Sequence, residues 1–178
     1  MQDSSRRHFI KFAIVAAASM TVPRLAWASA PARTLSFYHL HTGETLNVAY
    51  CENGKYIPSA MQTLNHFLRD WRTDDVHNID PALLDQLYAL QQQMETRTPY
   101  HVICGYRSPK TNQMLHAHSE GVASHSMHLE GRAIDIRLPG KDLALLHKAA
   151  LSMNAGGVGY YPGSDFIHID TGRVRHWG

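Results

Sequence analysis

The stretch Ser126–Asp135 constrains this chain more than any other part of its sequence. It holds His128 and Asp135 seven residues apart, and a second histidine, His168, follows between apolar neighbours further along. An extended chain rises about 3.3 Å per residue, so His128 and Asp135 can meet only if the chain folds back between them. Gly131 permits this turn because it has no Cβ. The pattern predicts a turn, a strand that carries Asp135, and a neighbouring strand that carries His168.

Two imidazoles and one carboxylate are donors that a catalytic zinc ion takes from a protein, with a fourth position left for water. Zinc lowers the pKa of that water to about 7, which makes it a nucleophile for hydrolysis at neutral pH. We therefore expect Zn²⁺, one ion per chain, on His128, Asp135 and His168. The chain has 13 histidines, and a single histidine near a strand is more often just a hydrogen-bonded residue. His125 could compete for the ion but is interpreted as a supporting or substrate-facing group, and His118 as a surface residue.

Hydrophobic periodicity predicts a mixture of strands and helices. Strands are expected at residues 34–40, 45–50, 100–105, 132–138, 158–160 and 166–170, and helices at 59–72, 80–97, 108–116 and 142–154. This order of elements indicates the α+β class, in which helices pack against a small antiparallel sheet.

Residues 1–30 are typical of an export signal. Ser5-Arg6-Arg7 forms a twin-arginine pattern, and the apolar run at 12–20 is too short to span a bilayer comfortably. Small residues at 28–30 fit a cleavage site, although an uncleaved membrane anchor is the alternative. We expect the twin-arginine export machinery to carry the chain to the periplasm. Residues 31–178 would then form a single domain with no stable membrane anchor.

The charge balance changes when this segment is set aside. Residues 1–30 hold four of the 17 basic and one of the 15 acidic residues, which leaves 13 and 14 for the rest. Such a balance argues against a nucleic-acid partner. The two cysteines, Cys51 and Cys104, are predicted either to pair in an oxidising compartment or to remain two buried thiols. Cys104 follows two apolar residues and is interpreted as a core residue.

The stretch Ser126–Asp135 resembles the Ser-x-His-x-x-Gly-x-Ala-x-Asp signature of the LAS-type zinc peptidases, a family that includes D-Ala-D-Ala carboxypeptidases and the zinc-bearing Hedgehog domain. Gly105-Tyr106-Arg107-Ser108 resembles the upstream arginine motif of that family. The runs at 35–38, 156–162 and 173–177 are most similar to its murein endopeptidase K group. The resemblance implies a Hedgehog/D,D-peptidase-like fold and zinc on His128, Asp135 and His168. It also implies peptidoglycan stem peptides as substrate, bound through Arg107, which would stabilise the developing oxyanion.

The general base is less well defined by the sequence. Many relatives place an acid three residues before the last histidine ligand, and Asp165 occupies that position. Asp170 lies two residues after His168 and so shares its strand face. We predict proton transfer by Asp165 and support of His168 by Asp170, with the reverse assignment left open. The predicted function is a zinc murein endopeptidase, and the alternatives are a carboxypeptidase that trims stem peptides or a zinc-stabilised module that only binds the cell wall.

Overall fold

The computed structural model describes residues 31–118 and 123–178, so the predicted export signal lies outside the described residues. The strands are β1 (Arg33–His39), β2 (Thr45–Glu52), β3 (Lys55–Tyr56), β4 (Tyr100–Cys104), β5 (Ala133–Arg137), β6 (Gly157–Tyr161), β7 (Phe166–Asp170) and β8 (Arg175–Trp177). The α-helices are α1 (Pro58–Phe67), α2 (Pro81–Gln93), α3 (Pro109–His118) and α4 (Leu143–Ser152), and two 3₁₀ turns are η1 (Met127–Glu130) and η2 (Pro162–Ser164). In the part of the chain described, no helix is long and apolar enough to cross a membrane.

The strands form one eight-stranded sheet in the order β3-β2-β1-β4-β5-β7-β6-β8. The α+β class is confirmed, but the sheet is larger than expected and mixed. β4 pairs parallel to β1, and β8 pairs parallel to β6, whereas the other neighbours are antiparallel. The parallel pair β1–β4 arises because α1 and α2 intervene in the sequence, and a connection of this length can return the chain in the same direction.

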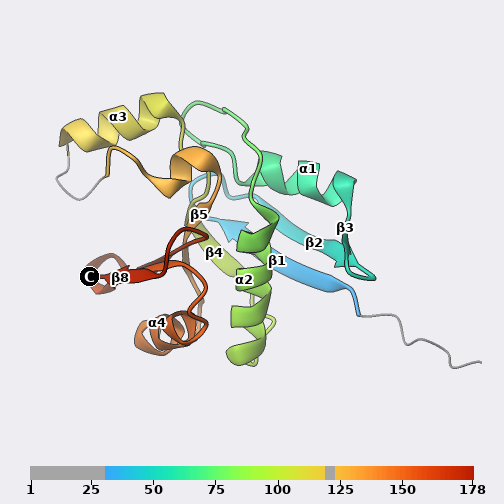
Figure 1. Cartoon of the computed structure of the whole chain (residues 1–178). Helices are drawn as coiled ribbons and strands as arrows, with labels where there is room; N and C mark the ends of the chain where they lie inside the picture. The colour runs from blue at the N-terminus through green and yellow to red at the C-terminus, as the bar shows by residue number, and fades with distance from the viewer. Residues whose placement is uncertain (1–30, 119–122) are drawn as a thin grey trace, which may run out of the picture.

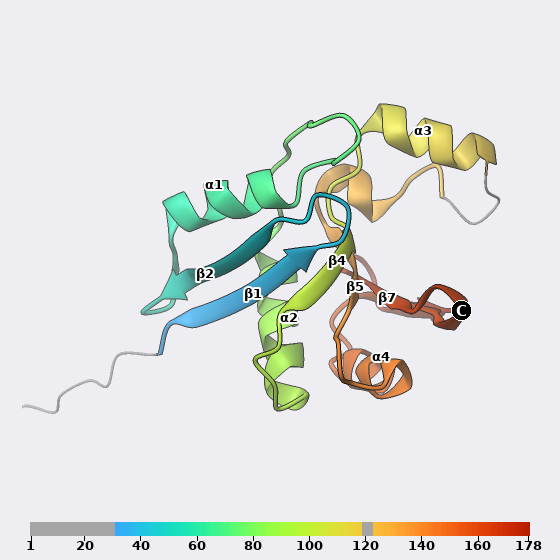
Figure 2. The ribbon, with the colours of Figure 1, turned by 180° about the vertical axis from the view of Figure 1, so that it is seen from behind.

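The hydrophobic core lies between helices α1, α2 and α4 and one face of the sheet. α2 contributes Leu83, Leu84, Leu87 and Leu90, all fully buried, to the same cluster as Phe37 of β1. Burial of each such side chain contributes about 1.5–3 kcal/mol. Figures 1 and 2 view the sheet from opposite sides, with α2 in front of the strands in the first and behind them in the second.

The opposite face of the sheet carries the polar residues. Ile134 and Ile136 of β5 point into the core, so Asp135 between them points to the other face. The same alternation in β7 places His168 on that face. Strand register then aligns one row across five strands, in which the consecutive partners are Cys104, Asp135, His168, Gly159 and Trp177.

Helix starts follow the local signals, whereas two helices end several residues before the predicted position: α2 ends at Gln93 instead of residue 97, and α1 also ends early. Asp80 Oδ1 accepts a hydrogen bond from Ala82 N at 2.9 Å and caps α2, as its position before Pro81 predicts. The first helix was expected to continue to residue 72 but ends at Phe67. The carbonyl of the next residue, Leu68, accepts a hydrogen bond from Tyr106 N at 2.8 Å, so a tertiary contact replaces further helix.

Candidate active site

Three side chains from separate segments meet on the polar face of the sheet. Asp135 and His168 are direct cross-strand partners on β5 and β7. His128 reaches them from η1, whose first turn is capped by Ser126. The chain turns back at Gly131, which has a φ of +65° and where an added Cβ would collide with the carbonyl oxygen of Asn78. The turn expected at this glycine is therefore present, and it brings His128 beside the strand.

The donor atoms of these residues form a small triangle. His128 Nε2 lies 3.2 Å from His168 Nδ1 and 3.3 Å from Asp135 Oδ1. His168 Nδ1 lies 2.9 Å from Asp135 Oδ1. A zinc ion with bonds of 2.0–2.1 Å separates its tetrahedral ligands by about 3.3 Å. All three residues are at least 90% buried, so the donor set and its spacing fit a single small divalent cation. We call these three residues the donor triangle.

The second nitrogen of each histidine has a partner that orients the ring. His128 Nδ1 lies 2.7 Å from the carbonyl oxygen of Gly105, which can only accept, so this nitrogen is the donor. His168 Nε2 lies 3.0 Å from Asp170 Oδ2 and donates to this carboxylate. Each ring therefore turns its other nitrogen toward the triangle, where it is placed to bind a cation. Partners of this kind fix the tautomer and orientation of metal-binding histidines.

Asp170 is a fully buried carboxylate that supports the donor triangle from behind. Besides His168, it accepts hydrogen bonds from the backbone N of Gly157 at 3.0 Å and of Gly172 at 2.8 Å. Arg175 donates to both of its oxygens, at 3.0 and 2.6 Å. Burial alone raises the pKa of Asp170, but these hydrogen bonds, led by the one from His168, bring the pKa well below its usual range. Because both oxygens are already occupied, the geometry favours the supporting role over proton transfer.

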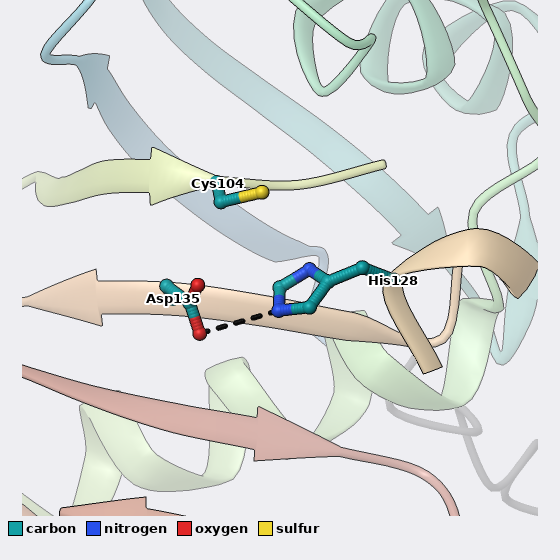
Figure 3. A group of neighbouring side chains, drawn as sticks. All are labelled: Cys104, His128 and Asp135. Carbon is teal, nitrogen blue, oxygen red and sulfur yellow. Dashed lines mark ion pairs between the residues drawn. The ribbon is translucent and has the colours of Figure 1, made fainter. Parts of the chain in front are cut away.

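Sequence reasoning missed one neighbour of the triangle, Cys104. Its sulfur, a nitrogen of His128 and an oxygen of Asp135 all lie within 4.8 Å of one another. Figure 3 shows Cys104 on β4 and Asp135 on the neighbouring β5, with the His128 ring facing both. The register between β4 and β5 shifts between Val102 and Cys104, and this irregularity turns Cys104 toward the polar face. Both cysteines are buried free thiols, so of the two alternatives left open by the sequence, the one with two buried thiols is present.

The charges in this cluster are strongly coupled. Burial by itself lowers the pKa of His128, but the Asp135 carboxylate and the Cys104 thiol beside it raise that pKa to about 10. Burial by itself raises the pKa of Asp135, and the two histidines outweigh this effect and lower it. The pKa of Cys104 is lowered overall, because His128 and Arg107 outweigh the opposing effect of burial. A cation that enters the donor triangle must therefore displace a proton, and its affinity should fall as the pH falls.

Arg107 is the cation nearest to the triangle. Its Nη2 lies 3.9 Å from Asp135 Oδ2 and 3.7 Å from Cys104 Sγ, and its side chain is only 11% exposed. Nη1 donates to Asn112 Oδ1 at 3.3 Å, whereas the buried Nε has no hydrogen-bond partner among the described residues. The backbone N of Arg107 donates to the carbonyl of His128 at 3.1 Å, which ties the turn to η1. The guanidinium of Arg107 thus lies beside the donor triangle and retains a hydrogen-bond donor without a partner among the described residues.

The donor triangle opens into a cavity of about 390 Å³. The exposed His125, predicted to face the substrate, lines this cavity, as do Tyr161 and Trp177. Trp177 Nε1 donates to Tyr161 Oη at 2.8 Å. A Cβ added to Gly159 would lie only 2.7 Å from the nearest atom of the Trp177 indole. This position in the row therefore requires a glycine. The cavity therefore has an acidic and imidazole floor and an aromatic wall.

The structure does not bring Asp165 to this site. Asp165 follows η2 with a φ of +53°, and its carboxylate accepts a hydrogen bond from Arg137 Nη1 at 3.1 Å. It lines a different cavity, together with Arg137. Its predicted role as the base therefore has no geometric support here.

Comparison with known proteins shows the family of this chain. The family model described as peptidoglycan L,D-endopeptidase MepK matches residues 27–177. The peptidoglycan L,D-endopeptidase MepK of Escherichia coli (strain K12) is 47% identical over 178 residues, which cover 98% of each chain. The protein of the same name from Shigella flexneri matches equally well. A relative from Haemophilus influenzae is 40% identical over 179 residues, which cover 98% of this chain and 96% of the relative.

Proposed function

Because the chain belongs to the peptidoglycan L,D-endopeptidase MepK family, we propose that it is a metal-dependent murein endopeptidase that cleaves L,D peptide crosslinks in the periplasm. One observation supports the metal dependence. It is the buried triangle of His128 Nε2, Asp135 Oδ1 and His168 Nδ1 at the floor of the larger cavity, which is the one of about 390 Å³. The family resemblance noted in the sequence supports the same three residues. The named relatives support the substrate and the bond type.

Zinc is the ion that we assign to the donor triangle. Two neutral imidazoles and one carboxylate suit zinc, and a set of three protein ligands leaves a position for water or substrate. When bound, zinc supplies a Lewis acid and a water of lowered pKa. The chain itself supplies the burial and the orienting contacts of His128 to Gly105 and of His168 to Asp170. These contacts hold the donors in place before the ion arrives.

Arg107 binds the scissile carbonyl in this proposal. Its Nη2 lies near Asp135 Oδ2, and its Nε is buried without a partner among the described residues. A substrate oxygen beside this guanidinium would accept a hydrogen bond that the free protein lacks. Negative charge that develops on this oxygen is stabilised by a fixed cation without reorganisation of solvent. The aromatic wall of Tyr161 and Trp177 borders the substrate and excludes water.

Proton transfer is assigned to His125. Asp170 has both oxygens occupied, and Asp165 lines another cavity. Among the described residues that line the larger cavity, His125 is the one imidazole outside the donor triangle. An imidazole exchanges protons near neutral pH, as a group that accepts a proton from water and returns it to the leaving amine must do. This assignment replaces the carboxylate that sequence reasoning favoured.

The metal dependence can be tested with the purified mature chain and a crosslinked stem-peptide dimer. We expect removal of metal by a chelator to abolish cleavage, and stoichiometric zinc to restore it while magnesium does not. A hydrogen-bonded cluster without a metal role would behave differently. Full cleavage by a protein whose metal content has been measured as zero would refute the metal-dependent mechanism.

A further inference from the structure

A second cavity of about 290 Å³ lies beyond the donor triangle, where β5 ends and the chain turns toward α4. His101 of β4, Arg137 of β5 and Lys141 of the turn line it, together with Asp165. None of these residues takes part in the site described above. The cavity is therefore a candidate for a separate binding role.

This cavity is placed in line with the donor triangle. Asp135 and Arg137 are two residues apart on β5, so their side chains leave the same face of the sheet. His101 is the cross-strand partner of Arg137, and one pair, Val102 with Ile136, separates it from the row that contains Cys104 and Asp135. Two residues of a strand span about 7 Å, which is also the length of two residues of an extended peptide. A substrate with its scissile bond over the donor triangle can therefore extend one or two residues into the second cavity.

The charges of the second cavity favour an anion. Arg137 and Lys141 are two basic side chains, and Asp165 is the single acid among the residues that line it. Asp165 is 64% exposed and uses only one guanidinium nitrogen, Nη1 of Arg137. An ion pair so exposed contributes little, about 0–1 kcal/mol, and leaves the rest of the guanidinium fork for a ligand.

His101 adds a donor that has no partner. Its Nδ1 is buried and makes no hydrogen bond within the described residues. Burial and the neighbouring Arg137 both lower the pKa of His101, so its ring is neutral and can donate from one nitrogen. A buried polar nitrogen without a partner is costly, and rotation of the ring toward an acceptor in this cavity would remove that cost.

We propose that the second cavity is a subsite for a free carboxylate of the stem peptide, bound by Arg137, Lys141 and His101. The planar guanidinium and the imidazole N–H match a carboxylate, and a peptide substrate offers a free carboxylate at its C-terminal end. This proposal rests on the proposed function for the identity of the substrate. It gives Asp165 a different role from the predicted base, because its carboxylate then competes with the substrate for Arg137.

Binding to the intact zinc-loaded protein tests the subsite. The probes are one crosslinked stem-peptide dimer with free carboxylates and the same dimer with those carboxylates amidated, and affinity is measured by calorimetry under conditions too short for cleavage. We expect the wild type to bind the free acid roughly 10- to 100-fold more tightly than the amide, as befits hydrogen bonds to a charged group. This preference should collapse in Arg137→Gln and shrink in Lys141→Gln. It should widen in Asp165→Asn, which removes the competing carboxylate.

Lys148→Gln is the matched control, because Lys148 is exposed on α4 and does not line the cavity. It should keep the wild-type preference. Equal affinity of the wild type for acid and amide would overturn the subsite, as would a full preference retained by both Arg137→Gln and Lys141→Gln. Circular dichroism excludes misfolding, and Lys141→Gln alters only an exposed turn residue.

Cleavage of the same two probes separates this proposal from the function on which it rests. If both probes are cleaved and bind with equal affinity, the proposal of a carboxylate subsite is wrong and the proposed endopeptidase function is retained. If neither probe is cleaved but the preference for the acid persists, the subsite stands and the endopeptidase fails. Loss of cleavage in Asp165→Asn with unchanged affinity would instead support the predicted base and contradict the subsite.

Discussion

The two ring nitrogens of His168 make different contacts, and these contacts show how a single residue contributes to the site. Nδ1 points to Asp135 and His128, whereas Nε2 donates to Asp170. The buried charge of Asp170 is in turn held by Arg175. A residue near the end of the chain therefore orients a donor on β7 through one carboxylate. Asp135, in contrast, is itself one of the three residues of the donor triangle.

The donor triangle predicts which substitutions remove the metal. We expect His128→Ala, Asp135→Asn and His168→Ala each to lose zinc, because three ligands are the minimum for a catalytic site. Cys104→Ser should retain about one ion per chain, since the triangle is complete without the thiol. Metal analysis of the folded variants decides this. Retention in His168→Ala together with loss in Cys104→Ser would assign the third ligand to Cys104.

His125 and Asp170 should respond differently to substitution. His125→Gln should lower kcat by roughly 100-fold or more while zinc content is unchanged, because only proton transfer is lost. His118→Gln, on the exposed end of α3, is the control and should behave as the wild type. Asp170→Asn should weaken zinc affinity by roughly 10- to 100-fold, because the support of His168 is altered. A normal kcat with a raised KM in His125→Gln would reduce His125 to a substrate contact.

The connection between β4 and α3 is the element that presents Arg107. Asp70, which is 2% exposed, accepts hydrogen bonds from Ser108 N at 2.9 Å and from Ser108 Oγ at 2.7 Å. It also accepts one from Arg72 N at 3.0 Å. Burial alone raises the pKa of Asp70, but hydrogen bonds from Thr111 and Ser108 lower it overall. A carboxylate after the first helix thus anchors the turn that carries the guanidinium.

Asp70→Ala should lower the free energy of unfolding at pH 7 by roughly 2–3 kcal/mol, because buried donors lose their acceptor. The pKa of Asp70 is lower in the folded state, so its stabilising effect is present above the unfolded pKa of about 3.9 and is lost as the pH falls through the folded value. The difference between variant and wild type should therefore shrink below pH 4. Urea unfolding at pH 7 and pH 3 measures this. A difference of equal size at both values would show that the ionised carboxylate is not the stabilising form.

Local patterns predicted most elements, and each exception has its own physical cause. The strand expected at 45–50 is Thr45–Glu52, and the helix expected to begin at Asp80-Pro81 spans Pro81–Gln93. The first helix ends early because Leu68 pairs with Tyr106. The short strands β3 and β8 were missed, since two or three residues carry no periodicity of their own. Cys104 is buried as predicted, but its place beside His128 and Asp135 depends on an irregularity of strand pairing that the local sequence does not show.

At the scale of the whole molecule, the sheet brings together residues that the sequence separates by tens of positions. The antiparallel direction of β5 and β7 was foreseeable from the two motifs, and it places Asp135 beside His168. The parallel pairings of β1 with β4 and of β6 with β8 depend on long connections, which local sequence does not encode. The second cavity follows from the same arrangement. The motifs predicted the donor triangle as a group, whereas its supporting and substrate-facing neighbours required the fold.

Export is a property of the whole precursor. The twin-arginine pattern at Arg6 and Arg7 predicts that replacing both arginines by lysine leaves the precursor in the cytoplasm. Cell fractionation with antibody detection measures the distribution. Substitution of Arg24 by lysine, which leaves the pattern intact, is the control. Normal export of the double variant would point to the general secretory route.

Cleavage of the natural polymer tests the central claim most directly. Purified sacculi are incubated with the zinc-loaded mature chain or with His128→Ala, and the soluble products are weighed by mass spectrometry. The account predicts that the wild type converts crosslinked muropeptides into uncrosslinked ones, with one water added for each bond cleaved, and that His128→Ala does not. If the zinc-loaded wild type bound the sacculi but released no fragment over hours, the protein would be a wall-binding module and the endopeptidase assignment would be contradicted.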